Sequence, residues 1–169
     1  EVKLYDGIDK KKLQENMKYW LEAIMPICDE YDINMCVHPD DPPYPVFGLP
    51  RIIGRAEDIQ WMLDAVPNKH NGLTFCAGSF SAGEHNDCVA MAKQFADRTH
   101  FVHLRSCYIF PNGNFTEASH LGGRGHLIEL CRIFEKAEQE GKCNSGRRLP
   151  MRVDHGMTFT DEPGGVFDE

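Results

Sequence analysis

Four side chains that can bind a transition metal stand at the ends of four apolar segments of the chain. They are His38, Cys76, His103 and Asp154, two imidazoles, a thiol and a carboxylate. Zinc, iron and manganese all accept ligands of these types. Each of these residues also has a purely structural explanation. A histidine at a strand end can simply be hydrogen-bonded within the fold, and a cysteine in an apolar strand can be a small residue of the core. Their common position in the elements is what favours a metal site.

The elements that carry these side chains alternate between strand-like and helix-like patterns. Short apolar runs predict strands near residues 33–38, 72–77, 99–104 and 149–154. Apolar residues at three- and four-residue steps predict helices over residues 10–31, 56–66, 87–96 and 126–141. Pro26 should kink or end the first helix. A polar, glycine-containing loop is expected between the third strand and the last helix.

Strands that alternate with helices favour βαβ units, and strands that are apolar on both faces favour a buried parallel sheet, so the predicted class is α/β. In (β/α) barrels and open α/β sheets, functional residues gather at the carboxyl edge of the strands. The four side chains should therefore converge. An eight-stranded barrel needs about 250 residues, so 169 residues would form a single domain, 1–169, supplying about half of a barrel. A first residue of Glu rather than Met also suggests a fragment.

The composition disfavours several partners. The chain has 18 Lys and Arg against 26 Asp and Glu, and its net charge of -8 should repel nucleic-acid backbones and anionic membranes. No run approaches the roughly 18 apolar residues of a membrane span, and no signal peptide is visible, so the expected location is cytoplasmic. Seven scattered cysteines without a CxxC pair favour reduced thiols over a disulfide framework.

Several polar side chains near the strand ends could bind a polyhydroxy acid, since the guanidinium fork of arginine suits a carboxylate. The candidates are Asp40, Asp41, Arg51, Arg105 and His120. For the two arginines, a salt bridge within a loop is the alternative.

The remaining histidines divide by position. His155 directly follows Asp154 and is the best candidate to move a proton, because imidazole exchanges protons near neutral pH; packing in a loop is its alternative. We expect His70, His85 and His100 to be solvated. For His126, on the functional side of the predicted sheet, a helix-start role is as well supported as a substrate contact.

The run HPDDPPYPVFGLPRI (38–52) resembles the signature of the D-mannonate dehydratases, a family of the xylose-isomerase-like barrel group. Four further blocks are similar, in the same order and at compatible spacings: NGLTFCAGS (71–79), HFVHLR (100–105), FTEASHLGG (115–123) and MRVDHG (151–156). The resemblance covers nearly the whole chain, to about Gly156.

This resemblance implies a (β/α)8 TIM barrel, of which the chain supplies about the last four βα units. It implies dehydration of D-mannonate to 2-dehydro-3-deoxy-D-gluconate in hexuronate catabolism, with Mn2+ or Fe2+, other divalent first-row metals remaining open. The family's ligands fall on His38, Cys76, His103 and Asp154, and its acid/base histidine on His155. Its catalytic tyrosine has no counterpart in residues 157–169. A half-barrel exposes apolar edges, so we expect a homo-oligomer or a second chain.

Two other functions stay open at this point. A metal-dependent sugar isomerase or epimerase on the same barrel would use the same ligands, and an inactive fragment could serve only as a binding or assembly piece. A DNA-repair endonuclease of this barrel group is disfavoured by the net charge of -8.

Overall fold

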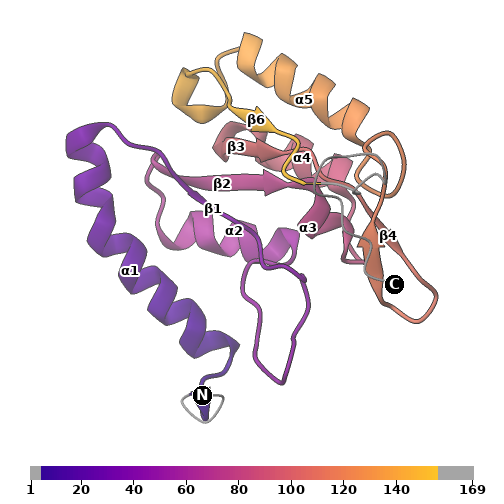
Figure 1. Ribbon diagram of the computed structural model, residues 1–169. Helices are drawn as coiled ribbons and strands as arrows, with labels where there is room; N and C mark the ends of the chain where they lie inside the picture. The colour runs from indigo at the N-terminus through magenta and orange to yellow at the C-terminus, as the bar shows by residue number, and fades with distance from the viewer. Residues whose placement is uncertain (1–4, 156–169) are drawn as a thin grey trace, which may run out of the picture.

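The computed structural model describes residues 5–155, and its centre is a four-stranded sheet flanked by helices (Figure 1). Short 3-10 helices are labelled η. The elements in chain order are α1 (Lys10–Tyr31), β1 (Met35–Val37), α2 (Ala56–Ala65), β2 (Asn71–Cys76), α3 (Ala77–Ser81), α4 (Cys88–Phe95), η2 (Ala96–Arg98), β3 (Thr99–His103), β4 (Cys107–Ile109), β5 (Phe115–Glu117), α5 (Leu127–Gln139), η3 (Asn144–Gly146) and β6 (Met151–Arg152).

The sheet is parallel throughout, and its strands follow one another in chain order, β1-β2-β3-β6. Cys76 of β2 pairs with His103 of β3, and His103 pairs with Arg152 of β6. The carboxyl ends of the strands therefore share one edge, here called the carboxyl edge. The α/β class and the four expected strands are confirmed, although β1 and β6 are shorter than the sequence indicates.

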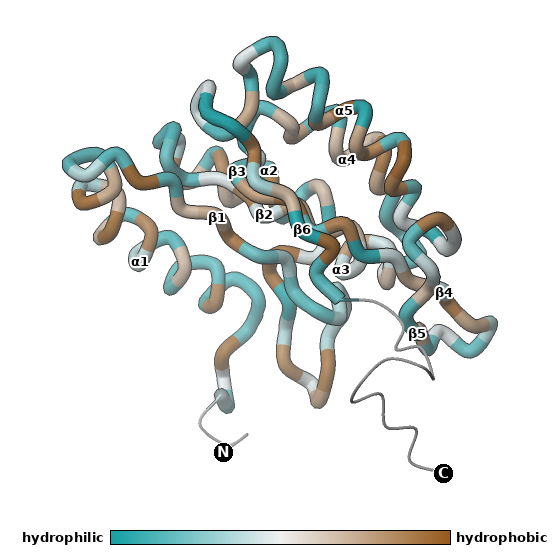
Figure 2. Tube along the Cα trace, turned by 45° about the horizontal axis from the view of Figure 1, so that its top comes forward, coloured by the Kyte–Doolittle hydropathy of each residue, from teal (hydrophilic) through white to brown (hydrophobic). Residues whose placement is uncertain are grey.

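The two faces of β2 have different neighbours. All six of its residues are buried. Leu73 and Phe75 belong to the apolar core that α1, α2, α4 and α5 build against the sheet, and Phe75 packs its ring 5.1 Å from that of Phe80 and 5.2 Å from that of Phe134. The alternate residues Thr74 and Cys76 point to the other face. In Figure 2 the central strands are mostly brown, whereas the helices alternate between teal and brown.

Helix α1 continues through Pro26 to Tyr31, so the proline does not end it. A proline removes one helical hydrogen bond, the bond to the carbonyl four residues earlier. Here that carbonyl belongs to Glu22, and both Glu22 and Pro26 are exposed, so water can replace the lost donor. Met25 and Cys28, on the opposite side, are buried and keep this turn packed on the core.

The loop expected after β3 contains a small antiparallel hairpin, β4–β5, in which Cys107 pairs with Glu117. Gly113 takes a positive φ of 85° at its turn, a conformation that glycine adopts without strain. Helix α3, directly after β2, is also absent from the expected elements, because the run AGSFS has no apolar period. Both additions lie at the carboxyl edge.

Two of the three histidines expected in solvent are buried, so that prediction is wrong for His70 and His100. His70 is 1% exposed, and its Nδ1 lies 2.7 Å from Oδ1 of Asn34. His100 is 3% exposed and its Nε2 donates to the carbonyl of Lys69. Each lies beside the start of a buried strand. Nδ1 of His100, however, is buried and has no hydrogen-bond partner among the described residues. His85 is exposed, as expected.

All seven cysteines lie within the described residues and are free thiols, as predicted. His126 directly precedes α5, as expected. Among residues 5–155, no helix has both the length and the apolar character that a membrane crossing requires.

Candidate metal centre

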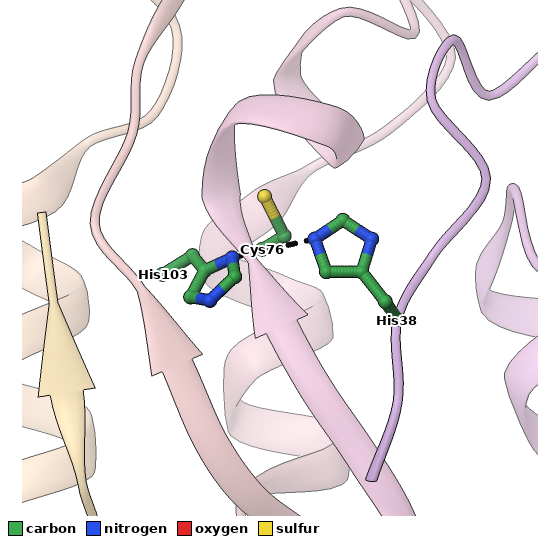
Figure 3. A group of neighbouring side chains, drawn as sticks. All are labelled: His38, Cys76 and His103. Atoms are coloured by element: carbon green, nitrogen blue, oxygen red, sulfur yellow. Dashed lines mark hydrogen bonds between the residues drawn. The ribbon is translucent and has the colours of Figure 1, made fainter. Parts of the chain in front are cut away.

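Three of the four expected metal ligands converge at the carboxyl edge. His38 follows β1, Cys76 ends β2 and His103 ends β3. One ligand atom from each lies within 4.8 Å of the other two. Figure 3 shows the two imidazole rings turned toward one another, with the thiol of Cys76 rising from the strand between them. The prediction that these strand ends bring the three side chains together is confirmed.

Asp154, the fourth expected ligand, approaches the same group from the segment after β6. Its Oδ1 lies 3.6 Å from Nδ1 of His103, and its Oδ2 lies 4.0 Å from Sγ of Cys76. Its backbone has a positive φ of 65°, which is uncommon for a residue other than glycine and occurs often at functional sites. The carboxylate is thus directed at the group formed by His38, Cys76 and His103.

The spacing of these atoms suits a single metal ion. His38 Nε2 and His103 Nδ1 are 3.3 Å apart. A tetrahedral ion with bonds of about 2.0–2.3 Å holds neighbouring ligand atoms about 3.3–3.8 Å apart. The His38–His103 pair already has this separation, and Oδ1 of Asp154 is 3.6 Å from Nδ1 of His103. The sulfur lies farther out, because Sγ of Cys76 is 4.0 Å from Oδ2 of Asp154 and the ligand atoms of His38, Cys76 and His103 span up to 4.8 Å, so an ion would have to draw the thiol inward.

His38 is oriented by its own backbone neighbour. Its Nδ1 lies 2.7 Å from the carbonyl oxygen of Pro39, so Nδ1 carries the proton and donates it there. This leaves the lone pair of Nε2 free toward the other ligands, the arrangement that metal-binding histidines use. A hydrogen bond with Cys76 raises the pKa of His38, and burial opposes this rise.

His103 has the opposite tendency. Burial lowers its pKa, the Asp154 carboxylate raises it, and the neighbouring His38 lowers it further, with a net lowering. A metal ligand must be the neutral imidazole. The surroundings of His103 therefore favour the form that binds a metal.

Cys76 has a partner that the sequence analysis missed. The Oγ of Ser79 donates to Sγ of Cys76 at 3.2 Å, and the backbone N–H of Ser79 lies 3.5 Å from the same sulfur. Donors of this kind stabilise a thiolate. The spacing Cys-x-x-Ser across the start of a helix could have indicated the contact, had α3 been predicted.

Arg105 lies two residues after His103 and is 4% exposed. Its Nε and Nη2 donate to the carboxylate of Glu117, and its Nη1 donates to Asp41. Burial lowers the pKa of the guanidinium, but the hydrogen bonds to Glu117 and Asp41 outweigh burial and raise it above its ordinary value. Arg105 is therefore permanently charged, and Glu117, a residue that the sequence analysis missed, neutralises it.

The other expected substrate-binding residues lie in loops at or beside this edge. Oδ2 of Asp40 accepts hydrogen bonds from the N–H groups of Ile52 and Ile53, both at 2.8 Å, and closes the loop after β1. Nη1 of Arg51 lies 3.7 Å from Oδ1 of Asp40. Nε2 of His120 lies 3.4 Å from the carbonyl of Val153, next to Asp154. That these residues bind substrate stays a prediction.

His155 is the most accessible member of the site, with a side chain that is 58% exposed. Its Nδ1 lies 3.7 Å from Oε1 of Glu117, and its Nε2 lies 3.8 Å from Oδ2 of Asp154. It thus stands between the metal-binding group and the network of Arg105. Gly156, the last residue of the MRVDHG block, and the segment 157–169 lie outside the described residues.

Comparison with known proteins identifies the family of the chain. The family model described as D-mannonate dehydratase (UxuA) matches residues 1–167. The chain is 39% identical over 159 residues to the mannonate dehydratase of Chromohalobacter salexigens and 40% identical over 160 residues to mannonate dehydratase 2 of Agrobacterium fabrum, covering 94% of this chain in both cases. It covers 41% and 40% of those two relatives, and so spans about two fifths of their length.

A solved structure is also similar, the mannonate dehydratase from Streptococcus suis serotype 2. The match has a TM-score of 0.81 at 30% sequence identity and covers 94% of this chain and 44% of the other. The likeness of fold thus extends over nearly all of the described chain. With a family model that matches almost every residue, the chain belongs to the D-mannonate dehydratase (UxuA) family.

Proposed function

We propose that this chain carries the metal-dependent site that dehydrates D-mannonate to 2-dehydro-3-deoxy-D-gluconate, a hydro-lyase reaction. The observation that carries the proposal is the convergence of the ligand atoms of His38, Cys76 and His103 within 4.8 Å, beside Asp154, in a chain of this family. We propose these four as the ligands of Mn2+ or Fe2+. A set that mixes nitrogen, sulfur and oxygen atoms accepts several first-row ions, which is consistent with either.

We further propose that residues 1–169 are one domain and form the C-terminal portion of a (β/α)8 barrel, contributing about its last four βα units. A parallel sheet whose strands follow the chain order is consistent with a segment of such a barrel. The free edges of β1 and β6 would then be covered by further βα units. We also propose that the protein forms a homo-oligomer, since strand edges and apolar faces that stay exposed favour pairing with another copy.

The reaction removes a proton from the carbon beside the substrate carboxylate and a hydroxyl from the next carbon. When bound, a divalent ion supplies positive charge that stabilises the negative charge developing on the carboxylate oxygens. We assign the proton transfer to His155, which is accessible and adjacent to Asp154. The hydroxyl leaves as water after it receives a proton, and the resulting enol becomes the 2-keto group of the product.

Recognition of the sugar acid is proposed for Asp40, Asp41, Arg51, Arg105 and His120. Among these, His120 is half-buried and lies beside the backbone of Val153, close to the ligand Asp154. Arg51 keeps 30% of its side chain exposed, and its nearest carboxylate is 3.7 Å away. These two are the best placed to contact a substrate hydroxyl or carboxylate directly. The other three already have strong internal partners.

The test is a product assay on the purified chain with D-mannonate and added Mn2+, with 2-dehydro-3-deoxy-D-gluconate measured directly. We expect product that disappears with EDTA and returns when Mn2+ is restored. His155→Ala should retain the metal and lose turnover. A chain that binds Mn2+ but forms no product contradicts the proposal, as does a His155→Ala variant with full activity. A neutral ketose offered in parallel separates a dehydratase from an isomerase.

A further inference from the structure

Arg105 is the one buried cation that contacts several of the segments carrying the metal ligands, among the residues that the structure describes. Its side chain is 5% exposed, and all three of its guanidinium nitrogens donate to a carboxylate. A charge buried this deeply is tolerated only when it is paired and hydrogen-bonded. The three contacts therefore fix the position of the guanidinium tightly.

The partners of Arg105 belong to the strand ends that supply the ligands. Asp41 lies three residues after His38, and Arg105 itself lies two residues after His103. Gly78 lies two residues after Cys76, and a Cβ added to it would come within 2.3 Å of Cγ and Cδ of Arg105. The aliphatic stem of Arg105 thus packs directly on the backbone of α3.

The fourth ligand segment is reached through Glu117. Its Oε1 accepts hydrogen bonds from Nε and Nη2 of Arg105 at 2.8 and 2.6 Å, and lies 3.7 Å from Nδ1 of His155. His155 directly follows the ligand Asp154. A single guanidinium therefore connects the segments after β1, β2, β3 and β6.

We propose that Arg105, with Asp41 and Glu117, is a positioning network that sets the spacing of the metal ligands and holds His155 toward Glu117. The part concerning His155 rests on the proposed function, whereas the part concerning the ligands is tested without any substrate. Groups that orient metal ligands without touching the metal typically change affinity by about 10- to 100-fold when they are removed.

Two other roles for Arg105 give different results. If Arg105 acted only in recognition of the sugar acid, the role proposed for it above, its substitution would raise KM and leave metal affinity unchanged. An ion pair that only stabilises the fold can be replaced by apolar side chains of similar volume with little loss. A positioning network predicts that substituting Arg105 weakens metal binding, whether the new side chain is charged or apolar, although the chain stays folded.

The experiment measures Mn2+ affinity by calorimetric titration of the purified chain, with no sugar acid present. Arg105→Lys keeps the charge but loses the two-pronged donation to Glu117, so we expect about 10-fold weaker Mn2+ binding. Gly78→Ala displaces the aliphatic stem of Arg105 without changing any charge, and it should also weaken Mn2+ binding. The double variant Arg105→Met with Glu117→Met keeps the volume without a buried charge, and tests the network if a single variant fails to fold.

Arg98→Met is the matched control. Arg98 is a half-buried arginine that donates to the carbonyls of Asn68 and Asn71 near the opposite edge of the sheet, so its loss should leave Mn2+ affinity unchanged. In turnover assays, Arg105→Lys should lower kcat more than it raises KM. Folded Arg105→Lys and double variants that bind Mn2+ within twofold of the wild type would overturn the inference. A wild-type chain that binds Mn2+ without forming product would overturn the proposed function and leave the affinity series to decide this inference.

Discussion

The two edges of the sheet both contain histidines, but only one edge has the chemistry of a site. At the edge where the strands begin, here called the amino edge, Nδ1 of His70 faces Oδ1 of Asn34, and Nε2 of His100 donates to a backbone carbonyl. At the carboxyl edge, His38 and His103 face each other at 3.3 Å, with Cys76 within reach. Within residues 5–155, the histidines of the amino edge belong to no group at metal-binding spacing.

The two pairs of histidines differ both in burial and in their partners. His70 and His100 are almost completely buried, whereas His38 is exposed and His103 is half-buried. At the amino edge each ring pairs one nitrogen with an amide oxygen or a backbone carbonyl, and Nδ1 of His100 has no partner among the described residues. Neither ring joins a converging set of metal-binding atoms, so we interpret the amino edge as structural. At the carboxyl edge a second imidazole, a thiol and a carboxylate lie around the same position, and the metal ion that we propose there would bind all of them. The predictions below test this contrast.

The largest effect is expected at the carboxyl edge. Cys76→Ala removes the proposed thiol ligand beside the two imidazoles and should weaken Mn2+ binding by more than about 100-fold. The fold should persist, because a small buried side chain is replaced by a smaller one. Affinity is measured by titration, and circular dichroism checks the fold.

Cys143→Ala is the control for this experiment, since Cys143 is equally buried but lies beside η3, away from the ligands. It should bind Mn2+ as the wild type does. Equal affinity in the Cys76→Ala and Cys143→Ala variants would show that the thiol of Cys76 is not a ligand.

The amino edge should instead control the response of stability to pH. Burial lowers the pKa of His100 to about 4, from 6.5. As the pH falls, His100 therefore binds a proton in the unfolded chain before it does so in the folded chain. Its contribution to the free energy of unfolding is fully present above pH 6.5 and is lost as the pH falls through 4. The loss amounts to about 3 kcal/mol.

Denaturant unfolding between pH 4 and 7 measures this effect as a difference between the wild type and His100→Phe, which keeps a buried ring but has no proton to exchange. The wild type should lose more stability on acidification than the variant. If the free energy of unfolding changed with pH equally in the two proteins, protonation of His100 would not be the cause of the acid sensitivity.

A smaller effect is expected for Asn34→Ala. The amide of Asn34 donates to Oδ1 of Asn144 at 2.7 Å and accepts from His70, so its loss leaves a buried ring nitrogen without its partner. We expect a loss of about 2 kcal/mol in the free energy of unfolding. Asn112→Ala, in the exposed hairpin turn, should change stability by less than about 0.5 kcal/mol.

Mn2+ affinity separates the two edges again in this variant. Asn34→Ala should bind the ion as tightly as the wild type, because Asn34 lies at the start of β1 and the ligands lie beyond the other ends of the strands. A loss of affinity as large as that of Cys76→Ala would show that the edges act as one unit.

Much of the fold could be predicted from the sequence because the main signals are local. The period of α1 and the apolar run of β2 need no tertiary information, and the order of parallel strands places His38, Cys76 and His103 at one edge. Pro26 misleads because its cost depends on whether the opposed carbonyl faces water. The short helix α3 and the hairpin β4–β5 have too few residues to show a period.

The parts of the site that the sequence did not reveal depend on contacts between distant residues. Glu117 meets Arg105 because the pairing of β5 with β4 brings Glu117 opposite Cys107, two residues after Arg105, and Ser79 meets Cys76 only after α3 forms. The burial of His70 and His100 likewise follows from amide and carbonyl partners supplied by neighbouring loops. None of these contacts has a signature in the spacing of residue types.

X-ray absorption spectroscopy of the Zn2+-loaded chain tests the central claim most directly, because it reports the ligand atoms of the bound ion. We predict one sulfur neighbour at about 2.3 Å with nitrogen or oxygen neighbours at about 2.0–2.1 Å. The sulfur signal should vanish in Cys76→Ala and persist in Cys143→Ala. A shell of nitrogen and oxygen atoms alone, or a spectrum unchanged by Cys76→Ala, would contradict the metal centre at the carboxyl edge.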